Sequence, residues 1–65
     1  MNELAKLNKL LHHWREHNDE HAETYKEWSE KASRWGKNDL SAILLKLCNE
    51  TKKLNGLFEE ALRKL

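Results

Sequence analysis

Apolar side chains recur in alternating steps of three and four along both halves of the chain. This spacing places them on one stripe of an α-helix and is typical of helices that pack in coiled coils and bundles. The sequence contains no proline, so neither helix has an obvious breaker. The predicted stripes run through Leu4, Leu7, Leu11, Trp14, Tyr25, Trp28, Ala32 and Trp35 in the first half, where positions 18 and 21 complete the spacing, and through Leu40, Leu44, Leu47, Thr51, Leu54, Phe58, Ala61 and Leu65 in the second.

A short turn separates the two stripes. Gly36 can adopt the left-handed conformation that ends many helices, and Asn38 can cap the next helix with its side chain. The sequence therefore predicts an all-α fold, an antiparallel two-helix hairpin with helices at about 2–35 and 39–64, in a single domain over residues 1–65. In the predicted register the numbers of facing residues sum to about 75, so that His21 faces Leu54 and Asn55.

Some apolar side chains have no partner within such a hairpin. The first helix extends past the end of the second, which leaves Leu4 and Leu7 uncovered, and Ile43 and Leu57 widen the stripe of the second helix beyond the reach of one facing helix. A domain of this size is seldom stabilised by more than about 3 to 5 kcal/mol through its own core. We therefore expect a homodimer in which two hairpins form a four-helix bundle.

The charge balance indicates which partners to exclude. Twelve lysines and arginines against eleven aspartates and glutamates leave a net charge of +1, so neither nucleic acid nor an anionic membrane is expected as a ligand. No continuous apolar run predicts a signal peptide or a membrane span. The single cysteine, Cys48, has no internal disulfide partner and is expected in the core of a cytoplasmic protein.

The four histidines lie within ten residues of one another. His13, His17 and His21 are spaced four apart, so adjacent imidazoles share a helix face and can chelate one metal ion. Glu20, or the same residues of a second chain, could complete the site, whereas His12 is expected in solvent. This pattern favours a small metal-binding module for a divalent transition metal, which could be nickel, cobalt or zinc.

A second interpretation of the same residues involves no metal. In the predicted stripe, Asn18 and His21 interrupt the core and His17 flanks it, at the level of Thr51 and Asn55 on the second helix. A buried layer of hydrogen bonds among these side chains would fix register and oligomeric state. The function would then be that of a structural oligomerisation or protein-interaction module, and the sequence does not decide between the two.

No enzymatic activity is expected. The segments 13–17 and 17–21 formally match the H-x-x-E-H motif of zinc proteases, but a short hairpin offers no cleft or sheet to hold a peptide. Di-iron carboxylate proteins require a glutamate three residues before a histidine. Those positions are occupied here by Lys9, Leu10, Trp14 and Asn18.

The nine residues from Trp14 to Ala22 have the pattern W-x-E-H-N-x-E-H-A. With Trp28, Ala32 and Asn55, this segment resembles a small prokaryotic helical-hairpin domain of uncharacterised function, which occurs alone or beside nickel-handling accessory proteins of the carbon monoxide dehydrogenase type. The resemblance spans nearly the whole chain, although only the nine-residue segment is specific. It implies a helical hairpin and an association with metal handling but no activity. It carries over to Glu16, His17, Asn18, Glu20 and His21, whereas His12 and His13 lie outside the pattern.

Overall fold

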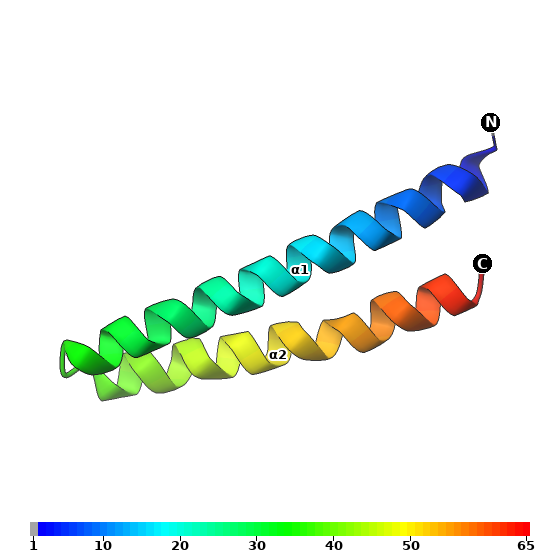
Figure 1. Cartoon of the computed structure of the whole chain (residues 1–65). Helices are drawn as coiled ribbons and strands as arrows, with labels where there is room; N and C mark the ends of the chain where they lie inside the picture. Colours follow the sequence, from blue (N-terminus) through cyan, green and yellow to red (C-terminus); the bar gives the residue numbers. More distant parts are fainter. Residues whose placement is uncertain (1) are drawn as a thin grey trace.

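The structure, a computed structural model that describes residues 2–65, consists of two helices, α1 (Glu3–Arg34) and α2 (Asn38–Arg63). They pack side by side in opposite directions as a hairpin (Figure 1). The molecule is a rod, with principal extents of 52 × 17 × 10 Å. The predicted all-α antiparallel hairpin is confirmed, and the helix ends lie within one residue of the predicted bounds. Neither helix is long and apolar enough to cross a membrane.

The turn closes as predicted at its glycine and differs at its asparagine. Gly36 has a φ of 78°. The N–H of Lys37 donates to the carbonyl of Ala32 at 2.9 Å and the N–H of Gly36 to that of Ser33 at 3.0 Å, which is the Schellman arrangement that ends α1. The predicted cap by Asn38 is wrong, because α2 begins at Asn38 and Lys37 precedes it without a side-chain capping bond.

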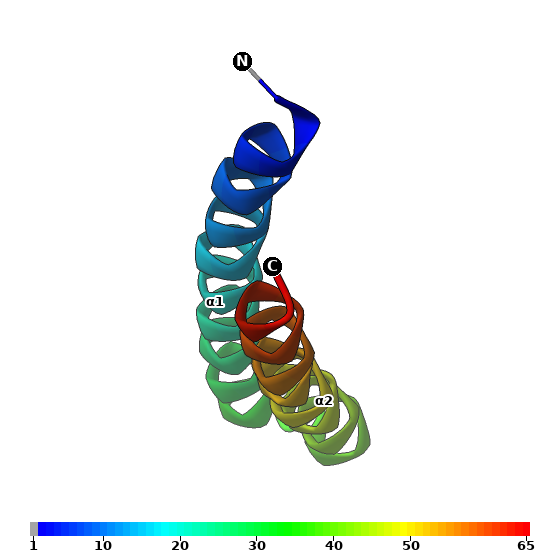
Figure 2. The ribbon, with the colours of Figure 1, turned by 90° about the vertical axis from the view of Figure 1, so that its right-hand side faces the viewer.

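The N-terminal end of α1 extends beyond the C-terminal end of α2, as Figure 2 shows. Leu4 and Leu7 lie on this extension and are exposed, as predicted. Asn2 caps the helix, since its Oδ1 accepts a hydrogen bond from the N–H of Ala5 at 2.8 Å. The first turns of α1 therefore form a regular helix that α2 does not cover.

The two helices meet along a seam whose most deeply buried residues are small. Ala22, Ser29 and Ala32 of α1 and Cys48 of α2 are buried in it, and small side chains let two helices approach closely. Most of the buried and half-buried positions alternate by threes and fours. The seam consists of Leu11, Arg15, Asn18, Ala22, Tyr25, Ser29 and Ala32 of α1, and of Ser41, Leu44, Cys48, Thr51, Asn55, Phe58 and Leu62 of α2.

The predicted stripe is correct in its period and wrong in its position. Leu11, Tyr25 and Ala32 do lie in the seam, but Trp14 and Trp28 are 44% and 45% exposed. The apolar residues of each helix occupy so much of its circumference that either of two adjacent stripes could face the other helix. Hydrophobicity alone favours the stripe that contains the tryptophans. Close packing of the helices instead selects the small residues one position further along.

Two pairs of hydrogen-bonded side chains set the register. The Ser29 hydroxyl donates to the carbonyl of Ser41 at 2.9 Å, and the Ser41 hydroxyl donates to the carbonyl of Ser29 at 2.8 Å. Further along, Asn18 pairs with Asn55. Counting from these two pairs, His21 lies level with residues 49–52 of α2, about one helical turn away from the predicted level of Leu54 and Asn55.

Candidate functional site

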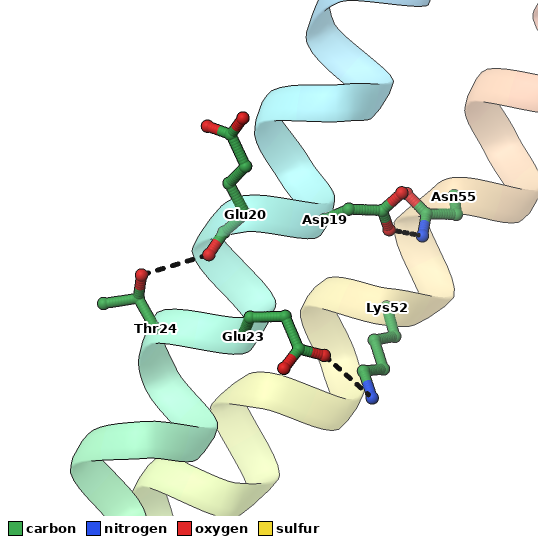
Figure 3. Close-up of polar contacts among 6 residues, drawn as sticks. All are labelled: Asp19, Glu20, Glu23, Thr24, Lys52 and Asn55. Carbon is green, nitrogen blue, oxygen red and sulfur yellow. Dashed lines mark hydrogen bonds and ion pairs between the residues drawn. The ribbon is translucent and has the colours of Figure 1, made fainter.

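A polar layer crosses the seam near the middle of the hairpin. The Nδ2 of Asn18 donates to the carbonyl of Thr51 at 2.6 Å and to Oδ1 of Asn55 at 2.9 Å. The Nδ2 of Asn55 in turn donates to a carboxylate oxygen of Asp19 (Figure 3). The predicted meeting of Asn18 with Thr51 and Asn55 is confirmed. No histidine takes part in these hydrogen bonds. The predicted layer of buried hydrogen bonds therefore exists, but asparagines form it without His17 or His21.

A second polar pair in the seam has no counterpart in the sequence predictions. Ser29 is 5% exposed, and its reciprocal hydrogen bonds with Ser41 satisfy both hydroxyls next to the turn. The spacing of the sequence could have indicated this pair, because Ser29 lies seven residues after the buried Ala22 and Ser41 lies seven residues before the buried Cys48. Buried hydroxyls paired in this way hold the register without a cost from unsatisfied groups.

The histidine row lies on the outside of α1. The ring centroids of His13 and His17 are 4.6 Å apart, those of His17 and His21 are 6.0 Å apart, and those of His21 and Tyr25 are 6.1 Å apart. The predicted stacking of these imidazoles along one face is confirmed. The predicted place of His21 in the core is wrong: His21 is exposed, and the next residue, Ala22, occupies the buried position instead.

The part of the chain that the structure describes contains no complete metal site. Over residues 2–65, no three side chains of the His, Cys, Asp and Glu types gather closely enough to hold an ion. Glu20 extends from α1 on the side away from α2 (Figure 3), and His13 lies two helical turns from His21. Cys48 is a free thiol buried in the seam, as predicted. Among the described residues the hairpin therefore offers neighbouring imidazoles, His13 with His17 and His17 with His21, and no group of three ligands.

Large apolar side chains lie exposed along both helices. On α1, Leu7, Trp14, Trp28 and Trp35 are separated by multiples of seven residues, and His21 occupies the remaining position of that line. On α2 the same spacing relates Leu40, Leu47 and Leu54, and a parallel line contains Ile43 and Leu57. Side chains seven residues apart lie nearly above one another on a helix. Each helix therefore carries a line of uncovered apolar groups, and the line on α1 is interrupted at His21.

These lines lie on the same side of the hairpin. On α1, His21 and Trp28 come directly before the seam residues Ala22 and Ser29, and on α2 Leu47 comes directly before Cys48. In both helices, the residue before a seam residue is rotated by about 100° around the helix axis, away from the seam. The two helix axes point in opposite directions and the two seams face each other. The residues that precede the seam residues therefore lie on the same side of the hairpin in both helices. We call this side the exposed apolar face; its apolar members are Leu7, Trp14, Trp28, Trp35, Leu40, Ile43, Leu47, Leu54 and Leu57.

The opposite side of the hairpin is polar. Residues that directly follow seam positions lie there. Among them, Oε1 of Glu23 in α1 lies 4.0 Å from Nζ of Lys52 in α2 (Figure 3). Asp19 reaches across to α2 on this side as well. Exposed pairs of this kind contribute little stability, but they are suited to contact with water. The hairpin is thus divided lengthwise into a charged side and an apolar side.

One part of the exposed apolar face already has an internal arrangement. The rings of Trp28 and Trp35 are 6.2 Å apart, and the Nζ of Lys31 lies 4.1 Å from the centroid of the Trp28 ring. The stem of this lysine covers aromatic surface while its charge is satisfied by the ring. Trp28 and Trp35 therefore form a compact pair near the turn and are not independent groups in solvent.

Comparison with known proteins identifies the domain but not its activity. The family model described as "Domain of unknown function (DUF8180)" matches residues 7–65, a range that includes α2 and nearly all of α1. No curated protein and no solved structure matches the chain. The resemblance to an uncharacterised helical-hairpin domain is confirmed to this extent, and the family description mentions neither nickel nor any other ligand.

Proposed function

We propose that this chain, which belongs to the DUF8180 family, is a self-association module in which two hairpins pack through their exposed apolar faces to form a four-helix bundle. The observation that supports it best is the exposed apolar face itself. Contiguous apolar patches on one side of a soluble protein mark sites where another surface binds. A hairpin with a charged side opposite such a patch has the form of half a bundle.

The total surface area supports this proposal. A compact monomer of this mass exposes about 4,400 Å², whereas the hairpin exposes 5170 Å² for 7.8 kDa. The hairpin therefore exposes roughly 800 Å² more than a compact monomer of its mass. This is about the area that each partner buries in an interface of standard size. A second copy would therefore restore the surface expected of a folded protein.

The composition of the core supports it as well. Among the described residues the buried hydrophobic side chains are Leu11, Ala22, Ala32 and Cys48, and three of these are small. Large seam side chains such as Tyr25, Leu44 and Phe58 are only half-buried, and the three tryptophans and several leucines are on the exposed apolar face instead. A hairpin of this kind gains most of its hydrophobic stabilisation only when that face is covered.

The face is also arranged to match itself. Counting from the Ser29–Ser41 and Asn18–Asn55 pairs, Trp28 lies within one helical turn of the level of Ile43, and Trp14 lies within one turn of the level of Leu57. A two-fold axis parallel to the helices keeps every residue at its level and places α1 of each copy on α2 of the other, so apolar side chains would meet apolar side chains. A two-fold dimer requires such a self-complementary surface, which favours a second copy of the chain over an unrelated partner.

The test is a comparison of two leucines of almost equal exposure. Leu47 belongs to the exposed apolar face and is 43% exposed, whereas Leu45 follows the seam residue Leu44, lies on the polar side and is 45% exposed. Light scattering should give twice the chain mass for the wild type and for Leu45→Glu, and the chain mass for Leu47→Glu. A wild-type protein that remains at 7.8 kDa at high micromolar concentration would contradict the proposal.

Metal binding is a second candidate function, and the stacked imidazoles of His13, His17 and His21 favour it. Within one chain these residues supply only a two-imidazole chelate, with Glu20 directed elsewhere. Stable zinc sites use three or four protein ligands. A functional site for nickel, cobalt or zinc would therefore need further ligands from outside the hairpin.

A further inference from the structure

We propose that two hairpins bind divalent transition-metal ions between them, each ion held by His17 and His21 of one copy and by Glu50 of the other. This inference rests on the self-association proposed above, because Glu50 joins the two histidines only across the dimer interface. Imidazole and carboxylate are ligands that Zn²⁺, Ni²⁺ and Co²⁺ accept. Glu50 is a ligand that the sequence pattern did not indicate.

The two histidines form a ready half of the site. His17 and His21 are one helical turn apart with ring centroids 6.0 Å from each other, and both are exposed. Two histidines four residues apart on one helix are a recurrent zinc-binding arrangement. His21 occupies the central position of the tryptophan and leucine line on α1. The pair therefore lies at the middle of the face that a second hairpin would cover.

Glu50 occupies the corresponding position on α2. It lies seven residues from both Ile43 and Leu57, which belong to the exposed apolar face, and in the range of residues that are level with His21. Its carboxylate pairs with Lys53 at 3.2 Å in an exposed ion pair, which contributes little. A carboxylate in the centre of an apolar interface is costly to bury unless a cation or hydrogen-bond donor meets it.

The symmetry of the dimer determines what Glu50 meets. A two-fold axis perpendicular to the helices would stack α2 on α2 and bring Glu50 against its own copy, which like-charge repulsion opposes. An axis parallel to the helices stacks α1 of each hairpin on α2 of the other and leaves every residue at its own level. Glu50 of one copy then meets His17 and His21 of the other, and the charges favour this second arrangement.

The resulting ligand set has a defined chemistry. Two imidazoles and one carboxylate give three protein ligands, and water can fill the remaining position, as in other zinc sites with two histidines and a carboxylate. The symmetry generates two equivalent sites per dimer. Since each site contains residues from both copies, metal binding stabilises the dimer, and dimer formation strengthens metal binding.

The test uses calorimetric titration of the whole chain with Zn²⁺, followed by Ni²⁺ and Co²⁺. We expect one ion per chain. His17→Gln, His21→Gln and Glu50→Gln should each weaken binding at least tenfold, whereas the matched controls His13→Gln and Glu20→Gln should bind as the wild type does. Loss of binding in His13→Gln as large as in His21→Gln would overturn the ligand assignment, and so would unchanged binding in Glu50→Gln.

The monomeric variant separates this inference from the proposed function. Leu47→Glu retains all three ligands but should lose the interface, so its Zn²⁺ affinity should fall at least tenfold while its helicity is retained. If the wild type is dimeric and Leu47→Glu, shown to be monomeric, binds Zn²⁺ as tightly, the shared site is wrong and self-association stands. If the wild type stays monomeric with and without Zn²⁺, self-association fails and the shared site fails with it.

Discussion

Replacing Trp28 with alanine should weaken the dimer strongly while the hairpin stays helical. The side chain is 45% exposed in the single hairpin, and a tryptophan can bury about 250 Å², so about 110 Å² remains to be covered by the second copy. At about 25 cal/mol per Å² this is about 2.8 kcal/mol for each chain. A dimer loses this contribution twice.

The expected change in affinity follows from these numbers. A loss of about 5.6 kcal/mol corresponds to a dissociation constant about 10⁴-fold higher, since about 1.4 kcal/mol changes an equilibrium tenfold. Sedimentation equilibrium over a range of concentrations would measure the constant, and circular dichroism would check that the helices persist. Leu45→Ala is the control, because Leu45 has the same exposure on the polar side. A dissociation constant for Trp28→Ala within tenfold of the wild-type value would refute the reasoning.

Three further predictions concern the seam, the turn and the metal site. Asn18→Ala removes two hydrogen bonds of the polar layer and should lower the free energy of unfolding by about 1 to 3 kcal/mol in urea titrations, whereas Asn49→Ala on the exposed surface should change it by less than about 0.5 kcal/mol. Gly36→Ala should destabilise by about 1 to 2 kcal/mol, because Gly36 has a positive φ that alanine adopts poorly. Gly56→Ala, at a helical position with open space around the added methyl group, should stabilise by about 0.5 to 1 kcal/mol, so equal effects of the two substitutions in thermal unfolding would contradict the assignment of the turn. Zn²⁺ should raise the temperature of thermal unfolding of the wild type, because an ion that binds only the folded state stabilises it, and a rise of the same size in His21→Gln would exclude His21 as a ligand.

The sequence predicted the helices and their connection because those features depend on local chemistry. The three-four spacing, the absence of proline and the conformational freedom of Gly36 each act within a few residues. The side of each helix that faces the other depends instead on how closely two backbones can approach. Ala22 and Ser29 allow that approach whereas their neighbours His21 and Trp28 do not. Hydrophobicity favours Trp28 over Ser29, and His21 was placed in the core because it fits the spacing set by Trp14 and Trp28.

The candidate site shows the same division. Asn18, Thr51 and Asn55 were predicted to meet, because a polar residue in an apolar stripe needs a polar partner at the same level. The histidines were placed beside them because His21 also fits the three-four spacing. A shift of the seam by one residue moves His21 to the outside and leaves Asn18 inside. The position of Glu50 opposite the histidines depends on the register and on a second chain, which no local pattern specifies.

The most direct measurement of the central proposal is hydroxyl-radical footprinting of the wild-type chain at increasing concentration. If the exposed apolar face is the dimer interface, the oxidation rates of Trp14, Trp28 and Leu54 should fall together as the dimer forms. The rate at Leu45, on the polar side, should stay constant. Oxidation of the two tryptophans that is independent of concentration, or protection of Leu45 instead, would contradict the account.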